Sequence, residues 1–157
     1  MSYQKHTKAF GNLQVVNSLL YHKAYKDVPG LAEKIELISR IIPFLRKKLK
    51  VSRNLQVVMR PIRGDDMLGQ FCEDDIIEID PRTESVYECV QVLCHEFVHA
   101  EQHHLGKLTW GDDGQFLWKK KKVEADYWHQ PWEKEAHERD QILASMVCIH
   151  FRIDREK

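Results

Sequence analysis

The feature that most constrains this chain is a pair of histidines, His95 and His99, in a segment with the apolar periodicity of an α-helix. Side chains four residues apart on a helix lie on the same face, about one turn apart, so the two imidazoles can converge on one metal ion. Glu96 follows the first histidine and is placed to accept a proton from a water molecule at that metal. The sequence therefore predicts a helix that carries a metal site.

The residues around these histidines support a helix over about residues 84–105. The apolar positions at helical spacing are Val86, Val90, Leu93, Phe97 and Ala100. Gly106 is suited to end the helix, because glycine readily adopts the left-handed conformation found just past helix ends. Val92 and His103 share the side of the helix that carries the two histidines and Glu96. We therefore expect one flank to pack into the core and the other to carry chemistry.

Length and composition indicate an ordinary globular domain. The 157 residues are 43% hydrophobic and 31% charged, and the formal net charge is zero. A net charge of zero provides no global attraction to nucleic acid or to an anionic membrane. The first residues lack the apolar run of a signal peptide, and no later stretch is apolar for long enough to span a bilayer. We expect a cytoplasmic protein with no membrane partner.

The four cysteines show no C-x-x-C pairing and are expected to be reduced thiols that mostly pack in the interior. They are Cys72, Cys89, Cys94 and Cys148. Cys94 precedes His95 directly, which makes it the one thiol that is also a candidate metal ligand.

Apolar patterning predicts an α+β fold in a single domain over residues 1–157. Helices are expected over about 11–25, 31–42 and from Pro131 to about Ile153, with Pro43 bending or ending the second. Strands are expected over 55–59, 69–71 and 76–80, and a hairpin-like turn at 73–75 joins the last two. The segment 107–130 has no clear periodicity and is expected to be a long, functional or mobile loop. We expect a short, mostly antiparallel sheet packed on helices that include the metal helix.

A catalytic zinc site needs a third protein ligand besides two histidines, and an open position for water. The candidates are His103, His104, His129, Glu133, Glu135 and His137. His103 lies one further turn, roughly 6 Å, along the helix from His99, which is too far for the same ion on a straight helix. The search for the third ligand therefore moves to the last helix.

That helix offers two glutamates, Glu133 and Glu135, on different faces. Glu135 aligns with Ile142, Met146 and Ile149, the expected centre of the apolar face. A carboxylate buried at that position would need a cation, either a metal ion or a Lys or Arg partner at the edge of the core. Glu133 points to a more mixed face. The pattern favours Glu135, and the alternatives are Glu133, His129 and His137.

The motif His95-Glu96-Phe97-Val98-His99, together with Glu135-Ala136, resembles the metal-binding elements of gluzincins, the zinc peptidases that include thermolysin. Gluzincins carry H-E-x-x-H on one helix and a glutamate ligand, often followed by alanine, on a later helix. The run from Pro131 to Ala136 is similar to the P-x-E-x-E-A run of small bacterial and phage metallopeptidase-like proteins. The resemblance covers about residues 50–150 and implies a zincin-like domain.

The resemblance implies a Zn²⁺ ion held by His95, His99 and Glu135, with Glu96 as the general base in peptide-bond hydrolysis. Its implied partner is a peptide or protein substrate, which for a protein this small is expected to be narrow in range. Many larger gluzincins place an aspartate four residues after the glutamate ligand to orient a zinc histidine. Here that position is Arg139, and an aspartate follows at the next position.

Two further expectations concern the substrate. Tyr127 and His129, just before the last helix, are candidates to donate a hydrogen bond to the oxyanion, although the pattern favours Tyr127 as a packing aromatic. The strand over residues 76–80 leads directly into the metal helix. Because zincins commonly bind extended substrate along an edge strand, this strand is the expected binding edge.

Two other functions compete with a peptidase. In a non-catalytic zinc module, a fourth protein ligand such as Cys94 or His129 would close the metal shell, but such a module has no use for Glu96 as a base. In a nucleic-acid-associated protease of the SprT-like kind, the lysines at 119–122 and nearby tryptophans would contact phosphates and bases. Those proteases carry a histidine as third ligand, and acidic residues near the lysines offset their charge.

Overall fold

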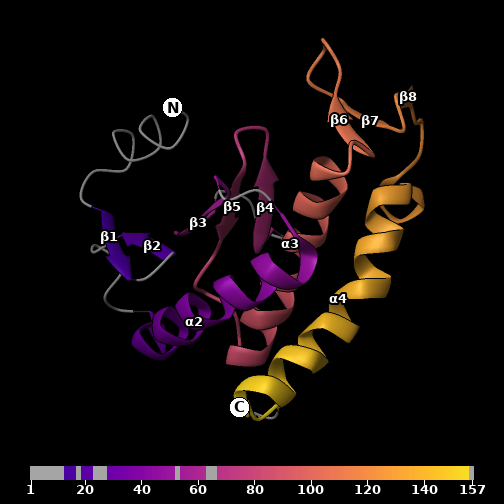
Figure 1. The fold of residues 1–157 in the computed structure, drawn as a ribbon. Coiled ribbons are helices and arrows are strands. Elements are labelled where there is room, and N and C mark those ends of the chain that lie inside the picture. Colours follow the sequence, from indigo (N-terminus) through magenta and orange to yellow (C-terminus); the bar gives the residue numbers. More distant parts are fainter. Residues whose placement is uncertain (1–12, 17–18, 23–27, 52–53, 63–66, 156–157) are drawn as a thin grey trace.

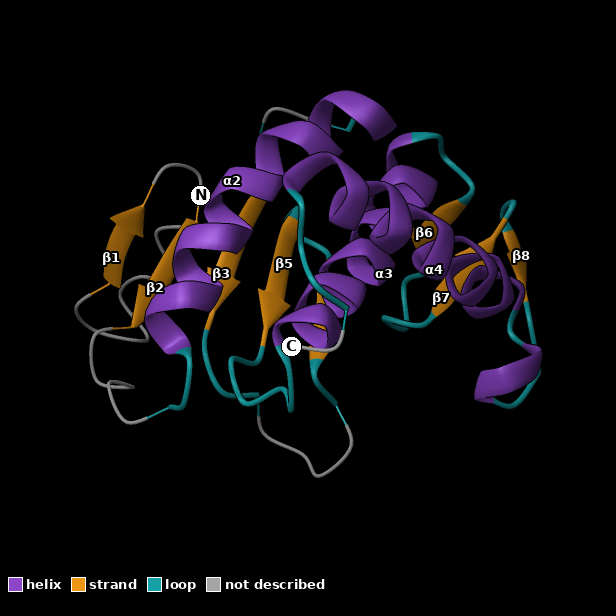
Figure 2. Cartoon of the chain, turned by 90° about the horizontal axis from the view of Figure 1, so that it is seen from below, coloured by secondary structure: helices purple, strands orange, loops and turns teal. Residues whose placement is uncertain are grey.

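The structure, a computed structural model, is an α+β domain (Figure 1). Helices on one side and a mixed β-sheet on the other make up most of it. The structure describes residues 13–16, 19–22, 28–51, 54–62 and 67–155. Within these ranges the larger sheet has five strands in the order β1-β2-β3-β5-β4, and a second sheet has three strands in the order β6-β7-β8. In Figure 2, α2 and α3 lie across the larger sheet and α4 lies beside α3.

The larger sheet is mixed rather than mostly antiparallel. Its strands are β1 (Leu13–Val16), β2 (Leu19–His22), β3 (Gln56–Met59), β4 (Gly69–Cys72) and β5 (Ile76–Ile79). The pairs β2–β3 and β3–β5 are parallel, whereas β1–β2 and β4–β5 are antiparallel. The predicted strands over 55–59, 69–71 and 76–80 are confirmed. In the turn that joins β4 to β5, Asp75 adopts a positive φ of 58°.

The predicted first helix over residues 11–25 is wrong where the structure describes that range, because β1 and β2 occupy it. The remaining positions of 11–25 lie outside the described residues. Both strands are short apolar runs, and such runs do not distinguish a helical repeat from a strand. Pairing of β2 with the buried strand β3 decides the structure in favour of strands.

Helix α2 (Leu31–Leu49) continues through Pro43. The prediction that the helix could end at this proline is therefore wrong. Proline lacks the N–H that an interior helical position donates, which disfavours it there. The residues that follow it nevertheless bury Leu45 and Leu49 in the core, and Ile38, Ile41 and Ile42 before it are fully buried. Packing on both sides of Pro43 outweighs the local preference.

Helix α3 (Val86–His104) is the predicted metal helix, and both of its ends have clear causes. At the N-terminus the Ser85 hydroxyl accepts from the Glu88 N–H at 3.0 Å, and the Glu88 carboxylate accepts from the Glu84 N–H at 2.7 Å. This pair is a variant of the capping box, in which the carboxylate accepts from the residue before the N-cap. At the other end Gly106 adopts a φ of 77° and stops the helix as expected. The apolar flank of α3, including Val90, is buried.

Helix α4 (Pro131–Phe151) begins with proline at its first turn, as predicted, and packs along α3. The side that faces the core consists of Trp132, Glu133, Ala136, Asp140, Leu143, Ala144, Val147 and Cys148. Ile142 and Ile149, which were expected at the centre of the apolar face, are 63% and 78% exposed. The buried face of α4 is therefore the face with small residues and two acids.

The segment 107–130 is largely structured, which corrects the expectation of a long loop. It forms the antiparallel sheet of β6 (Leu108–Trp110), β7 (Phe116–Trp118) and β8 (Lys121–Lys122), followed by the short helix η1 (Tyr127–His129). The strands are only two or three residues long, too short to show a period in the sequence. Rings from β6 and β7 pack on Phe71 and Trp132, which attaches this sheet to β4 and to the start of α4.

Among the described residues, no helix is both long enough and apolar enough to cross a membrane.

Candidate metal centre

The two motif histidines converge on one carboxylate, that of Glu133 on α4. His99 Nε2 lies 2.5 Å from Glu133 Oε1, and His95 Nε2 lies 3.5 Å from Glu133 Oε2. All three side chains are at least seven-eighths buried. Positions one turn apart on α3 and the first turn of α4 thus bring the two imidazoles against one carboxylate.

The other nitrogen of each histidine is held by a buried acceptor. His95 Nδ1 lies 3.0 Å from Asp140 Oδ2, and His99 Nδ1 lies 2.9 Å from Gln102 Oε1. Asp140 also accepts from Gln91 Nε2 at 3.4 Å, and Gln102 donates to the Trp132 carbonyl at 3.0 Å. These bonds orient both rings so that Nε2 is the nitrogen presented to Glu133, the arrangement that metal-binding histidines show in proteins.

Glu133, and not the preferred candidate Glu135, lies against the two histidines. The Glu135 carboxylate accepts from Gln102 Nε2 at 3.2 Å and lies 3.7 Å from Lys107 Nζ, with 28% of its side chain exposed. An ion pair at the core edge, the alternative interpretation of Glu135, is what the structure contains. The sequence predicts a mixed face for Glu133, because His137 and Asp140 share that face. In the structure this polar face of α4 lines a cavity.

Asp140, seven residues after Glu133, is the acid that holds His95 Nδ1. Glu133, His137 and Asp140 follow one another at spacings of four and three residues, so they share one face of α4. Arg139, at the neighbouring position, pairs instead with Glu101 of α3. The sequence did contain this signal, as a polar i, i+4, i+7 pattern.

Charge in the site shifts several pKa values. Burial alone lowers the pKa of His95, but its hydrogen bonds to Asp140 and Glu133 outweigh burial and raise that pKa to about 10. The pKa of His99 is raised in the same way, mainly by Glu133 against the effect of burial. Burial raises the pKa of Glu133, and the two histidines more than reverse this, so it falls well below its usual range. The carboxylates of Glu133 and Asp140 thus favour positive charge on the two imidazoles.

Glu96 lies beside the histidines on α3 and is 6% exposed. Burial raises the pKa of its carboxyl, and the neighbouring histidines oppose that rise. Strand β4 passes directly over it at Gly69. A Cβ at Gly69 would stand 2.6 Å from Val92 Cγ1 and 3.2 Å from Glu96 Oε1, so only glycine allows this close approach.

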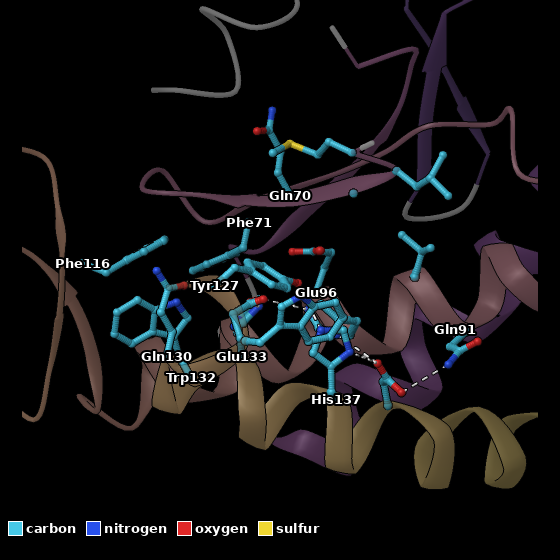
Figure 3. Close-up of a pocket in the computed structure, with 18 of the residues that line it drawn as sticks. Gln70, Phe71, Gln91, Glu96, Phe116, Tyr127, Gln130, Trp132, Glu133 and His137 are labelled. Carbon is cyan, nitrogen blue, oxygen red and sulfur yellow. Dashed lines mark hydrogen bonds and ion pairs between the residues drawn. The ribbon is translucent and has the colours of Figure 1, made fainter. Parts of the chain in front are cut away.

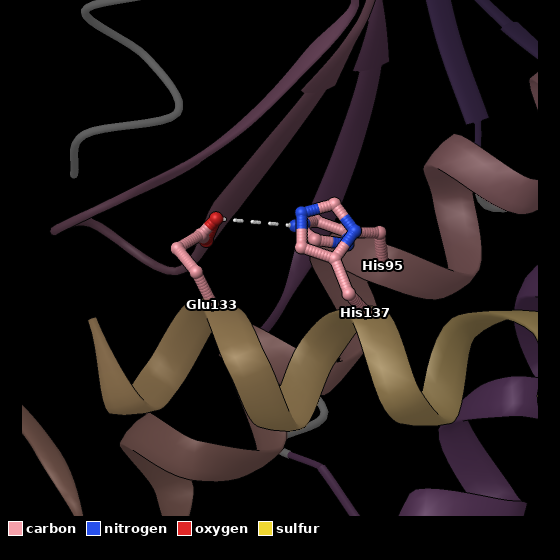
Figure 4. Close-up of side chains that lie close together, drawn as sticks. All are labelled: His95, Glu133 and His137. Atoms are coloured by element: carbon pink, nitrogen blue, oxygen red, sulfur yellow. Dashed lines mark ion pairs between the residues drawn. The ribbon is translucent and has the colours of Figure 1, made fainter. Parts of the chain in front are cut away.

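His137 and Tyr127 stand next to the same centre. One ligand atom from each of His95, Glu133 and His137 can be chosen so that all lie within 4.8 Å of one another, and Figure 4 shows Glu133 and His137 projecting from successive turns of α4. The Tyr127 hydroxyl lies 3.1 Å from His137 Nε2. Burial and then Glu133 raise the pKa of Tyr127, which keeps its hydroxyl protonated. The sequence pattern favoured Glu135 over His137 as the third ligand, although the spacing of four residues between Glu133 and His137 indicates that they share one face of α4.

A cavity of about 1060 Å³ opens over this centre. In Figure 3, Glu96, Glu133 and His137 lie in the middle, with Phe71, Phe116 and Trp132 towards one end and Gln91 at the other. Strand β4, at the open edge of the larger sheet, contributes Gly69, Gln70 and Phe71. The expectation that the strand over 76–80 is the edge is wrong, because β5 lies between β3 and β4.

The remaining candidate ligands lie away from the centre. His103 Nδ1 lies 3.0 Å from the Leu108 carbonyl and its ring contacts Trp110, while His104 is exposed. His129 is exposed and pairs with Asp126. Cys94 is fully buried in the core, where burial raises the pKa of its thiol far above the usual range. All four cysteines are free thiols, as predicted.

Comparisons with known proteins add no assignment: no family model matches the chain, and no curated protein or solved structure matches it significantly.

Proposed function

We propose that the protein is a zinc-dependent peptidase whose metal is held by His95, His99 and Glu133. One observation carries the proposal: both Nε2 atoms are directed at one buried carboxylate while both Nδ1 atoms are held by Asp140 and Gln102. Two imidazoles and one carboxylate are a common ligand set of catalytic zinc. The donor atoms, their burial and their supporting hydrogen bonds therefore fit the ion.

Zinc in this position supplies Lewis acidity, which polarises a carbonyl group and lowers the pKa of water. Glu96 is the residue suited to accept a proton from the attacking water, because it adjoins the histidines, lines the cavity and coordinates nothing itself. Its raised pKa suits the second half of the reaction, in which the proton passes to the leaving amine.

Tyr127 and His137 are suited to stabilise the negative charge that develops on the carbonyl oxygen. Both line the cavity next to the centre, and they are hydrogen-bonded to each other. Tyr127 stays protonated as its raised pKa requires, so its hydroxyl can donate. Removing a donor of this type typically costs about 10² to 10³-fold in rate. His129 is not suited to this task, because it is exposed, pairs with Asp126 and does not line the cavity.

An extended peptide is the substrate form that fits the cavity. Strand β4 is at the edge of the sheet and contributes three successive residues to the cavity wall. Such an edge can bind an added strand through backbone hydrogen bonds. This assigns the binding edge to β4 in place of residues 76–80.

A non-catalytic zinc module is the second candidate, and His137 is the observation that favours it. If His137 were a fourth ligand beside His95, His99 and Glu133, the metal shell would be closed and no position would remain for water. The two proposals differ in the effect of His137→Ala. In a peptidase the variant keeps its zinc and loses activity, whereas in a closed site it loses zinc affinity.

The test compares wild type with Glu96→Gln on one broad peptide pool, with zinc content measured in both. Both proteins should contain about one zinc per chain, and activity should fall by roughly 10² to 10⁴-fold in the variant. Glu138→Gln, at an exposed position on α4, is the matched control and should behave as wild type. Equal activity in wild type and Glu96→Gln would remove Glu96 from the mechanism. No activity in a zinc-loaded wild type would favour the module.

A further inference from the structure

We infer that the cleft selects a positively charged, extended peptide segment that places a large apolar side chain at one end and a basic residue at the other. The apolar end is the wall formed by Phe71, Phe116 and Trp132, called here the aromatic wall. The basic residue lies near Glu88. That the ligand is a peptide rests on the proposed function. The inference adds which peptides bind.

The length of the cleft sets the size of the segment. Residues of α3 line it from Glu88 to His99, over three successive turns. At 1.5 Å per residue this distance is roughly 16 Å along the helix axis. An extended chain advances about 3.3 Å per residue, so about five residues of a bound peptide lie over this stretch. A small metabolite would leave most of the cleft empty.

The aromatic wall is made by three separate elements, β4, β7 and α4. Phe71 and Trp132 are 8% and 4% exposed, and the Phe116 and Trp132 ring centroids are 5.5 Å apart. Behind them Trp110 contacts both phenylalanines, at 5.8 Å from Phe71 and 5.3 Å from Phe116. Because Trp110 packs against both phenylalanine rings, the aromatic wall presents a fixed apolar surface. A large apolar side chain would bury against it at little cost in conformational entropy.

The small sheet explains how Phe116 reaches the cleft. Strand β7 lies between β6 and β8, and β6 follows directly after the metal helix. The sheet holds Phe116 opposite Trp132 at the same end of the cavity as Phe71 (Figure 3). The structural role of this sheet is thus to complete one end of the cleft.

Charge favours a cationic occupant. Four carboxylates line the cavity, from Glu88, Glu96, Glu133 and Asp140, and none of the described lining residues is Lys or Arg. With a divalent ion bound and the four acids ionised, about two negative charges remain in the cleft. A nucleic-acid phosphate would be repelled by this lining, whereas a basic peptide would be attracted to it.

Glu88 is the carboxylate with no task at the metal. It lies two turns before His95 on the same helix, at the end of the cleft away from the aromatic wall, and it is half-buried. Its Oε2 atom accepts from the Glu84 N–H as part of the helix cap. Glutamine also serves at this position of a capping box, so Glu88→Gln removes the charge and keeps the cap.

The test measures peptide binding to zinc-loaded Glu96→Gln protein, which retains the cleft and does not turn over. Fluorescent eight-residue peptides carry Phe or Ala at one position and Lys or Glu four residues away, in both orders along the chain. The peptide with Phe and Lys should bind tightest in one of the two orders. Cleavage of the same peptides by the wild-type protein is measured alongside.

Two variant pairs assign the selectivity to its residues. Phe116→Ala should weaken binding of the Phe peptides by about tenfold and leave the Ala peptides unchanged. Phe44→Ala, a half-buried ring on α2 that packs on Phe151, is its control. Glu88→Gln should weaken the Lys peptides by about two- to fivefold, an effect that high salt removes. Glu84→Gln is the matched control for charge.

The outcomes separate this inference from the proposed function. Cleavage of all peptides with equal affinity would overturn the selectivity and leave the peptidase intact. Selective binding without any cleavage would support the inference and contradict the peptidase. Tighter binding of the Glu peptides than of the Lys peptides would overturn the charge argument, and an unchanged Phe116→Ala variant would overturn the role of the wall.

Discussion

Gly69→Ala is the substitution whose effect can be worked out most directly from the structure. The added Cβ would lie 2.6 Å from Val92 Cγ1 and 3.1 Å from Glu96 Cγ, whereas carbon atoms in contact are about 3.5–4.0 Å apart. Strand β4, helix α3 or the Val92 side chain must therefore move by about 1 Å. Overpacking of this size costs about 1–3 kcal/mol. The same displacement moves Glu96, so activity should fall by more than the loss of folded protein explains.

The assay for this prediction is a double-mutant cycle with Val92→Ala. Urea unfolding gives the free energy of each variant, and activity is measured where every variant is fully folded. Val92→Ala removes the methyl group that the new Cβ meets, so Gly69→Ala should cost at least about 1 kcal/mol less in that background. Additive free energies would refute the close approach of β4 to α3. Unchanged activity in folded Gly69→Ala would refute the placement of Glu96 under this strand.

Three further predictions concern the metal. Asp140→Asn should lower zinc affinity by about 10- to 100-fold in competition with a chromophoric chelator, because a neutral amide replaces the charged acceptor that orients His95. Glu138→Gln should change nothing. Chelation should lower the melting temperature reversibly, since the ion joins α3 to α4, and an unchanged melting temperature would argue against a site between them. Zinc binding at pH 8 should release about one proton from His95 into weak buffer, because its raised pKa of about 10 keeps the ring protonated without metal and coordination requires a neutral ring. Affinity should accordingly fall as the pH falls, and zinc binding without proton release would contradict the pKa argument.

The metal helix was predictable from sequence because its local signals agree with its packing. Ser85 and Glu88 cap it, Gly106 ends it, and its apolar repeat coincides with the buried flank. The hairpin of β4 and β5 was predictable for the same reason. Where a local preference and the tertiary environment disagree, as at Pro43, the environment prevails.

Glu133, the proposed third ligand, was not predictable by counting apolar residues on α4. That criterion selected Glu135, but Ile142 and Ile149 on its face point to solvent, and the small residue Ala136 lies on the buried side. A functional helix face is polar by necessity, so the mixed face with Glu133, His137 and Asp140 is the one turned inward. The strands of the small sheet escaped prediction because they are too short to show a period.

Zinc affinity of Glu133→Gln against Glu135→Gln tests the central claim most directly. Both glutamates lie in the first turns of α4, and only Glu133 faces the two histidines. The account predicts about one zinc per chain in wild type and in Glu135→Gln, and a loss of at least about 100-fold in affinity in Glu133→Gln with the fold retained in circular dichroism. The reverse order of the two variants, or equal affinity in both, would contradict a site built from His95, His99 and Glu133.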